Sequence, residues 1–330
     1  MTARVHLADG SARANRLEKA LFRGGGLSLD NADYRRAAEQ LLGILLRGDM
    51  GRRDLTVDAL GIKGRAAEAV FLAGESGVAA GLEEAALLLR GQGIETRLVS
   101  KDGEAIGPGD VLLDAEGDEG KLLSFERVVL NLLQRMSGIA SAARSLQERV
   151  ARVSQATHVV GTRKTLWGLL DKRALHLGNG GTHRLNLSDA ILIKNNHLAL
   201  LGTQEEDAVG PALERAWAHR VESAFVEVEV RGERAALEAA KTFRRLQEKE
   251  AGAAAEYPCL LMLDNMPPTE ISGVLDTLRR DGLWDSVLVE ASGGITDANL
   301  ESYAATGVDA ISMGALTHSA RALDVFARIS

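Results

Sequence analysis

Six short apolar runs follow one another through the second half of the chain, and helical stretches separate them. Runs this apolar are typical of strands that other elements cover on both faces. Strands that alternate with helices indicate parallel β-α units. The pattern therefore predicts a parallel α/β domain of the barrel type. Its predicted strands are residues 157–162, 190–194, 225–230, 259–264, 286–292 and 310–314.

The first half of the chain has a different pattern. Residues 33–49 space their apolar positions as an α-helix does. Short strand-like segments then follow, with a helical stretch at 82–93 between them and Gly or Asp turns at their ends. We expect a small α+β domain with a mainly antiparallel sheet. Its predicted strands are residues 67–73, 77–81, 95–100 and 110–117.

A long helix is predicted over residues 124–153, with Ser124 as its N-cap. Residues 1–28 are polar and rich in glycine at "FRGGG", so we expect an extension or a loosely attached helix there. The predicted parts are an N-terminal extension (1–28), a first domain (29–138), a barrel domain (139–317) and a C-terminal helix that packs on the first domain (318–330).

Composition narrows the class of protein. The chain has 330 residues, 45% of them hydrophobic, and a formal net charge of -7, which suits a globular protein of roughly two domains. The acidic balance argues against a nucleic-acid partner. A single cysteine, Cys259, excludes a disulfide framework and favours a reducing compartment. The first residues lack the apolar core of a signal peptide, and no apolar run reaches the ~20 residues that span a bilayer. We therefore expect a cytoplasmic protein without a membrane partner.

Positive charge is nevertheless concentrated between residues 152 and 197. Seven Lys or Arg stand there, with only Asp171 and Asp189 as acids. Two of the cations, Lys172 and Arg173, lie in a helical stretch, where we expect ordinary surface charges paired with nearby acids.

Four other cations lie at or near the ends of predicted strands. Guanidinium groups can hold carboxylates or phosphates through paired hydrogen bonds. In a parallel α/β barrel the carboxyl ends of the strands meet at one mouth, and that mouth is the active site. We therefore expect these cations to bind a strongly anionic ligand. They are Arg163, Lys164, Arg184 and Lys194.

Acids also end predicted strands. Glu229 and Asp264 could hold Mg²⁺ together with substrate oxygens, or accept hydrogen bonds from sugar hydroxyls. A salt bridge to one of the strand-end lysines is an equally open interpretation. Glu227 faces the same side of its strand as Glu229, and Glu290 precedes a Gly-rich loop and could play either role.

The histidines leave two interpretations open. His183 adjoins Arg184 in a Gly-rich loop and could bind an anionic or aromatic substrate, or it could be structural. His197 and His318 also follow strands, and the same two interpretations apply to them. We expect no zinc site, because the only cysteine lies within a strand and no histidine pair has metal-ligand spacing beside an acid.

The last two predicted strands lead into loops that contain glycine. Glycines let backbone N–H groups approach an anion, and a helix that follows adds a favourable dipole. The final loops of barrels often bind phosphate. We therefore predict a phosphate site formed by Ser292, Gly293, Gly294 and Gly314.

Taken in order, several blocks resemble the quinolinate phosphoribosyltransferases. The resemblance covers roughly residues 50–330 and rests on many ordered blocks, so it is more specific than any single motif. The blocks are "GVAAGLE", "ERVVLNLLQRMSGIA", "GTRKT", "THRLNLSDAILIKNNH", "EVEV", "MLDN", "EASGGI" and "GVDAISMGALTHSARALD".

The resemblance implies an N-terminal α/β sandwich domain followed by a six-stranded parallel α/β barrel. It implies an enzyme of NAD biosynthesis that joins quinolinate to phosphoribosyl pyrophosphate with Mg²⁺, giving nicotinate mononucleotide, CO₂ and pyrophosphate. It also implies a homodimer, or a higher oligomer, in which the first domain of one subunit covers the barrel mouth of its partner.

The resemblance also implies roles for single residues, carried over by motif. The set around the quinolinate carboxylates and the diphosphate is Arg163, Lys164, His183, Arg184 and Lys194, with Arg127 supplied across the dimer. Glu229 and Asp264 would hold the ribose hydroxyls and Mg²⁺. The 5′-phosphate set is Ser292, Gly293 and Gly314, and Gly294 and His318 complete the predicted substrate site. The predicted catalytic residues are Lys164, Lys194, Glu229 and Asp264.

Some positions depart from the family pattern. Trp167 stands where a proline is usual, Asn179 interrupts the glycine run, and Thr182 replaces the usual asparagine. An Ala- and Glu-rich stretch at 248–258 lengthens the connection into the fourth strand. These departures leave open a related enzyme that acts on another carboxylated heterocycle. Two further hypotheses are a Schiff-base lyase with Lys194 as its amine and a binding protein without catalysis.

Overall fold

The computed structural model describes residues 11–201, 205–250 and 256–330. The described residues form two compact units. We call residues 11–23, 146–163 and 181–315 the barrel unit, and residues 24–145, 164–180 and 316–330 the sandwich unit. Within the described residues no helix is both long and apolar enough to cross a membrane.

The barrel unit contains the six predicted parallel strands. Their order is β6-β11-β10-β9-β8-β7, so β7 to β11 follow one another in space as they do in sequence, and the last strand, β11, lies beside the first, β6. This is the strand order of a six-stranded α/β barrel, and the predicted fold is confirmed. The strands are β6 (His158–Val160), β7 (Ile191–Ile193), β8 (Val226–Val230), β9 (Cys259–Asp264), β10 (Leu288–Ser292) and β11 (Ala310–Ser312).

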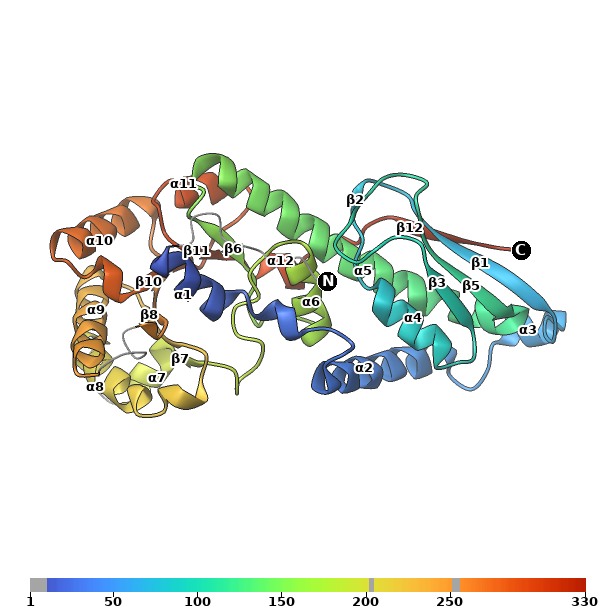
Figure 1. The fold of residues 1–330 in the computed structure, drawn as a ribbon, viewed down its shortest axis with the longest axis horizontal. Helices are drawn as coiled ribbons and strands as arrows, with labels where there is room; N and C mark the ends of the chain where they lie inside the picture. The colour runs from blue at the N-terminus through green and yellow to red at the C-terminus, as the bar shows by residue number, and fades with distance from the viewer. Residues whose placement is uncertain (1–10, 202–204, 251–255) are drawn as a thin grey trace. The chain divides into compact units, whose positions relative to one another are not determined.

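Helices follow the strands and lie around them (Figure 1). In α9, the small buried residues Ala235, Ala236, Ala239 and Ala240 let the helix pack closely on the strands. The elements after the strands are α7 (Asn195–Leu200), α8 (Glu205–Trp217), η2 (Arg220–Glu222), α9 (Glu233–Glu248), α10 (Pro268–Arg280), η4 (Trp284–Ser286) and α11 (Leu300–Ala304). The lengthened connection at 248–258 includes residues 251–255, which lie outside the described part of the chain.

Helix α1 (Ala12–Leu21) packs into the barrel near the amino ends of its strands. Ser11 caps the helix, and its hydroxyl accepts a hydrogen bond from Ala14 N at 3.1 Å. Leu17, Ala20 and Leu21 are buried in one cluster with strand residues. The expectation of a loosely attached helix in this segment is therefore wrong. The strand residues of the cluster, with those just before β7 and β8, are Val160, Ala190, Phe225, Leu260, Leu288 and Ala310.

The sandwich unit contains a four-stranded antiparallel sheet in the order β12-β1-β5-β3, and a two-stranded pair, β2 and β4. The strands are β1 (Ala66–Ala73), β2 (Gly77–Val78), β3 (Glu95–Leu98), β4 (Ala105–Ile106), β5 (Val111–Asp118) and β12 (Val325–Ile329). The helical elements are η1 (Arg23–Gly26), α2 (Ala32–Met50), α3 (Leu55–Leu60), α4 (Leu82–Arg90), α6 (Leu169–Leu177) and α12 (Ala315–His318). The first residues of η1 and α12, Arg23 and Ala315, still belong to the barrel unit.

The predicted C-terminal helix over 318–330 is wrong. Helix α12 ends at His318, and β12 adds an antiparallel strand beside β1, with Ala69 opposite Ile329. β-branched and aromatic residues such as Val325 and Phe326 suit a half-buried strand. The free edge of β1 supplies the hydrogen-bond partners that the local sequence could not reveal.

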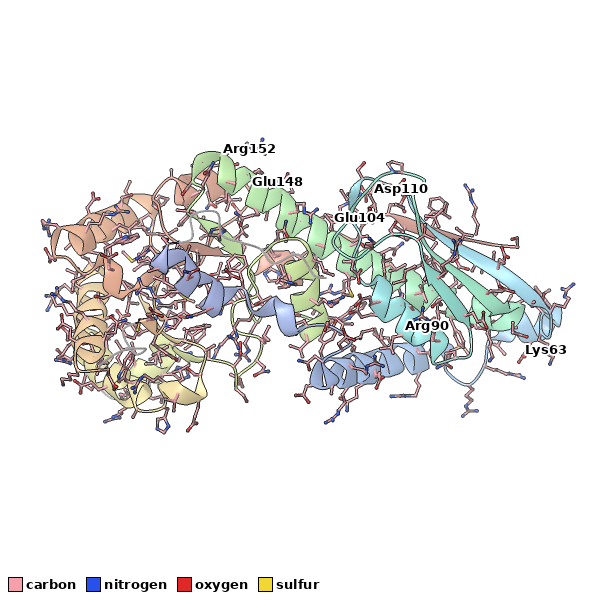
Figure 2. The ribbon with its side chains drawn as sticks, viewed as in Figure 1. Lys63, Arg90, Glu104, Asp110, Glu148 and Arg152 are labelled. Atoms are coloured by element: carbon pink, nitrogen blue, oxygen red, sulfur yellow. The ribbon has the colours of Figure 1, made fainter. Side chains whose placement is uncertain are left out.

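The long helix α5 (Glu119–Val153) begins five residues before Ser124. The carboxylate of Asp118 accepts a hydrogen bond from Lys121 N at 3.1 Å, which is the interaction that an N-cap provides. Ser124 lies inside the helix, so its prediction as the N-cap is wrong. Near the other end, the exposed Glu148 and Arg152 lie one turn apart on the solvent face (Figure 2).

The expectation that Lys172 and Arg173 are surface charges is also wrong. Both side chains are buried in α6. The guanidinium of Arg173 lies 2.7 Å from Glu84 and 2.6 Å from Glu83. Its acidic partners come from α4, about 90 residues earlier, so the local sequence could not show them.

Candidate active site

The predicted site residues of the barrel unit lie at the carboxyl ends of its parallel strands. Register pairs Ser292 with Asp264 on neighbouring strands, and it pairs Glu229 with Met262, two residues before Asp264. Side chains two residues apart share a face of a strand, so these three side chains point the same way. Lys194 follows β7 directly, and Arg163 and Gly314 follow β6 and β11. The roles of these residues stay predictions.

Both strand-end acids take part in ion pairs. Lys194 Nζ lies 3.0 Å from Glu229 Oε2. A salt bridge of this kind was one of the two interpretations open for Glu229 from the sequence. Arg231 Nε lies 3.1 Å from Asp264 Oδ2. The carboxyl side chains keep 10% and 13% of their surface exposed, so a ligand at the mouth can reach them.

Arg184 and Arg163 lie close enough for their positive charges to repel each other. Burial lowers the pKa of Arg184, and the positive charge of Arg163 lowers it further. Arg184 Nη1 donates to Ala190 O at 3.3 Å. Within the described residues, neither arginine forms an ion pair with an acid. An anionic ligand would relieve the repulsion between the two guanidinium groups.

His183, directly before Arg184 in the chain, is almost fully buried. Its Nε2 atom is 3.1 Å from a carboxylate oxygen of Glu227 and 3.1 Å from one of Glu290. Its Nδ1 atom accepts the backbone N–H of Arg184 at 2.8 Å. The contacts of both ring nitrogens fit the structural interpretation of this histidine.

Two of these side chains, His183 and Glu227, have raised pKa values. Burial lowers the pKa of His183, but the carboxylates of Glu290 and Glu227 raise it by more. Burial and then the charge of Glu290 raise the pKa of Glu227 to about 7. Two carboxylates this close and this buried cannot both ionise without a neutralising group.

A metal ion could in principle be that neutralising group, because donor atoms of His183, Glu227 and Glu290 all lie within 4.8 Å of one another. The histidine tautomer argues against it. The neighbouring carboxylates favour a proton on Nε2, and a neutral ring whose Nδ1 accepts a hydrogen bond also carries its proton there, so Nε2 has no lone pair for a metal. Sequence reasoning did not find this cluster, although two acids at inward positions of apolar strands were a usable signal.

The Ser-Gly-Gly loop is shaped by a close approach to Asn265. Gly293 has φ 88°, and a Cβ atom there would lie 2.5 Å from Asn265 Oδ1 and 2.9 Å from Asn265 N. Asn265 N donates to Ser292 O at 2.8 Å. The backbone can follow this path only with glycine at position 293.

The helices expected directly after the two glycine loops differ from the prediction. Helix α11 begins only at Leu300, six residues after Gly294. Asn299 bridges the gap, because its side chain accepts from Thr296 N at 2.7 Å and donates to Gly294 O at 3.1 Å. Helix α12 follows Gly314 directly but has only four residues. The predicted phosphate site would therefore depend on loop N–H groups more than on a helix dipole.

Three predicted residues belong to the sandwich unit: Arg127, Lys164 and His318. Arg127 is exposed on α5. Lys164 O accepts a hydrogen bond from the Thr317 hydroxyl at 2.6 Å. His318 is exposed, and its Nδ1 atom lies 2.6 Å from Ser319 Oγ. In the barrel unit, His197 Nδ1 accepts Lys194 N at 2.8 Å, which fits its structural interpretation.

Asp171 shapes the loop that follows Lys164. Its buried carboxylate pairs with Arg135 at 2.7 Å and accepts the backbone N–H groups of Leu166 and Trp167, each at 3.1 Å. The Arg135 guanidinium lies 5.1 Å from the centre of the Trp167 ring. The unusual tryptophan is thus held by a cation and by its own backbone.

Comparison with known proteins places this chain in one family. A family model described as quinolinate phosphoribosyl transferase, C-terminal domain, matches residues 139–327, and its N-terminal counterpart matches residues 54–137. The probable nicotinate-nucleotide pyrophosphorylase (carboxylating) of Methanothermobacter thermautotrophicus is 40% identical over 85% of this chain and 95% of its own length. The rat nicotinate-nucleotide pyrophosphorylase (carboxylating), from Rattus norvegicus, is 35% identical over 78% of this chain and 80% of its own.

Solved structures agree with the sequence relatives. The crystal structure of NadC from Streptococcus pyogenes has a TM-score of 0.74 at 32% identity, and it covers 88% of this chain and 96% of its own. Family models match both halves of the chain, and relatives above 30% identity match most of its length. The chain belongs to the quinolinate phosphoribosyltransferase family.

Proposed function

We propose that this chain transfers the phosphoribosyl group of phosphoribosyl pyrophosphate to quinolinate and releases CO₂ and pyrophosphate, giving nicotinate mononucleotide. The observation that carries the proposal is the cation pair Arg163 and Arg184 at the barrel mouth. Neither arginine forms an ion pair with an acid among the described residues, and a dicarboxylate matches the two guanidinium groups in charge and hydrogen bonding. Family membership supports the same activity.

In the proposed reaction the cations bind and orient the two anionic substrates. Arg163 and Arg184 hold quinolinate carboxylates, so the ring nitrogen faces the sugar carbon that loses pyrophosphate. Departure of pyrophosphate leaves an oxocarbenium-like sugar, and the carboxylate of Glu229 stabilises this positive charge. Lys194, released from its ion pair, stabilises the departing diphosphate.

Decarboxylation then needs no base from the protein. Once the ring nitrogen has bonded to the sugar, it is positively charged, and it stabilises the carbanion that forms when the adjacent carboxylate leaves as CO₂. A proton from solvent then bonds to this carbon and completes nicotinate mononucleotide. The described site accordingly needs no covalent nucleophile. Lys194 forms an ion pair with Glu229, so its amine is engaged by a carboxylate, which argues against a Schiff-base lyase.

Glu229 and Asp264 fit Mg²⁺ in their chemistry. Both are carboxylates on the same face of neighbouring strands, and hard oxygen ligands are what this ion prefers. Mg²⁺, when bound there with diphosphate, would supply Lewis-acid stabilisation of the leaving group. Asp264 would exchange its ion pair with Arg231 for the metal.

The proposal includes a cytoplasmic homodimer in which Arg127 completes the site across the interface. The exposed position of Arg127 on α5 is consistent with this role. Mixed dimers of Arg127→Ala and Lys164→Ala subunits test this role of Arg127. If the site is shared, one of the two sites in each mixed dimer contains neither substitution. Recovery of activity after exchange supports a shared site, and no recovery contradicts it.

The activity is tested by giving the purified chain quinolinate, phosphoribosyl pyrophosphate and Mg²⁺ and measuring nicotinate mononucleotide. A panel of other pyridine and pyrimidine carboxylates, assayed in parallel, identifies the preferred acceptor. Preference for another heterocycle would indicate a related phosphoribosyltransferase. Absence of any nucleotide product would contradict the proposed function.

A further inference from the structure

The end of helix α1 is hydrogen-bonded to the loop that carries Arg184. Leu21 O, at the last residue of the helix, accepts Thr182 N at 2.7 Å and His183 N at 2.9 Å. The Thr182 hydroxyl donates to the same oxygen at 3.2 Å. Carbonyl groups in the last turn of a helix lack partners within the helix, and here the loop supplies them.

Arg23, two residues further, joins the loop at two more points. Its backbone N–H donates to Thr182 Oγ1 at 3.0 Å, so this buried hydroxyl lies between Leu21 O and Arg23 N. Its Nε atom donates to Asp189 at 2.8 Å, and Asp189 Oδ2 accepts Leu185 N at 2.8 Å. Residues 21–23 therefore hold both ends of the segment 182–189.

Helix α1 is itself fixed to the barrel strands by apolar packing and by an ion pair. Leu17 and Leu21 are buried in the apolar cluster among the barrel strands. Arg13 forms a two-pronged ion pair with Asp309, with both nitrogen-oxygen distances at 2.6 Å. Asp309 also accepts Val289 N at 2.6 Å, which ties the pair to β10.

The supported loop needs such a restraint. His183 has φ 52°, a left-handed conformation that residues other than glycine adopt at a cost. Such a conformation persists only where neighbouring contacts determine it. Arg184 follows directly, so the direction of its guanidinium depends on the conformation held at Thr182 and His183.

We propose that residues 11–23 are a positioning element for the acceptor-binding loop, with Arg23 and Thr182 as the positioning residues that keep Arg184 ready to bind an acceptor carboxylate. This inference rests on the proposed function. It also explains the threonine at position 182: its short hydroxyl side chain fits between Leu21 O and Arg23 N, and accepts and donates at once.

The test compares Thr182→Val and Arg23→Gln with Thr182→Ser, which keeps the hydroxyl, and with Arg16→Gln, which removes a hydrogen bond from α1 to Asp285 O, away from the loop. Thr182→Val and Arg23→Gln should each raise the KM for quinolinate by about tenfold, the effect of losing a well-placed hydrogen bond. The KM for phosphoribosyl pyrophosphate and kcat should stay within about twofold. Thr182→Ser and Arg16→Gln should behave as the parent does.

Hydrogen exchange of the full chain provides a readout that does not depend on activity. The amides of Thr182 and His183 should be protected in the parent and exchange faster in Thr182→Val and Arg23→Gln, while strand β8 keeps its protection. Unchanged exchange at these amides would overturn the proposal. So would a lower kcat together with equal increases in the KM values of both substrates. If the parent does not use quinolinate at all, the proposed function fails, and the exchange data alone decide whether α1 holds the loop.

Discussion

Glu84 and Arg173 form a buried ion pair in the sandwich unit, with Oε1 and Nε 2.7 Å apart. Tyr34 donates its hydroxyl proton to the same carboxylate oxygen at 2.8 Å. Burial raises the pKa of Glu84 from 4.5 to about 7, although the charge of Arg173 opposes this. The proton on this carboxyl is therefore part of the stability of the sandwich unit.

The pair predicts a pH dependence of stability. Because the folded pKa is raised, the contribution of Glu84 is fully present below pH 4.5 and is lost as the pH rises through about 7. The free energy of unfolding should fall by up to about 3 kcal/mol between these values through this group. Denaturant unfolding across the pH range should show this slope in the parent and a flatter one in Glu84→Gln. Glu83→Gln, which changes the half-exposed partner of Arg173, should keep the slope of the parent.

Arg184→Ala should weaken quinolinate binding by about 10- to 100-fold, since a charged hydrogen bond to the acceptor is lost. Calorimetric titration measures the affinity, and thermal unfolding checks that the variant is folded. Arg215→Ala removes an exposed arginine from α8 and should leave the affinity unchanged. A folded Arg184→Ala variant with the affinity of the parent would remove Arg184 from the acceptor site.

Gly293→Ala should abolish most binding of phosphoribosyl pyrophosphate. The new methyl group would lie 2.9 Å from Asn265 N, a backbone atom that cannot move aside cheaply. Gly109→Ala is the matched control, because its φ is also positive but no atom lies within 4 Å of the added Cβ. It should lose about 1 kcal/mol of stability from backbone strain and keep its binding. Equal binding losses in the two variants would argue against a role for the close contact at Gly293.

Asp264→Asn should raise the Mg²⁺ concentration needed for half-maximal activity, because an amide oxygen lacks the charge that holds a hard cation. Arg231→Gln removes the ion-pair partner of Asp264 and should lower this concentration or leave it unchanged. An Asp264→Asn enzyme with the Mg²⁺ titration of the parent would show that this acid is not near the metal.

The carboxyl ends of the barrel strands could be predicted because apolar runs have a readable length and end at polar residues such as Lys194 and Asp264. The contacts between segments far apart in the sequence could not be predicted, because no local pattern shows them. Arg173 resembled a surface charge because Glu83 and Glu84 lie far away in sequence. Residues 325–329 resembled a helix because the edge of β1 that receives them is a property of the folded sheet. The position of His183 in a loop could be predicted from its glycine neighbours. The two acids that face it from strands β8 and β10 could not, because they lie far away in sequence.

The central claim is that phosphoribosyl transfer and loss of one carboxylate occur in the same site. Quinolinate labelled in the carboxyl group next to the ring nitrogen measures this directly. We predict one labelled CO₂ for each nicotinate mononucleotide and each pyrophosphate, only when phosphoribosyl pyrophosphate is present, and almost none from Arg184→Ala at the same substrate concentration. Release of CO₂ without phosphoribosyl pyrophosphate, or a nucleotide that keeps both carboxylates, would contradict it.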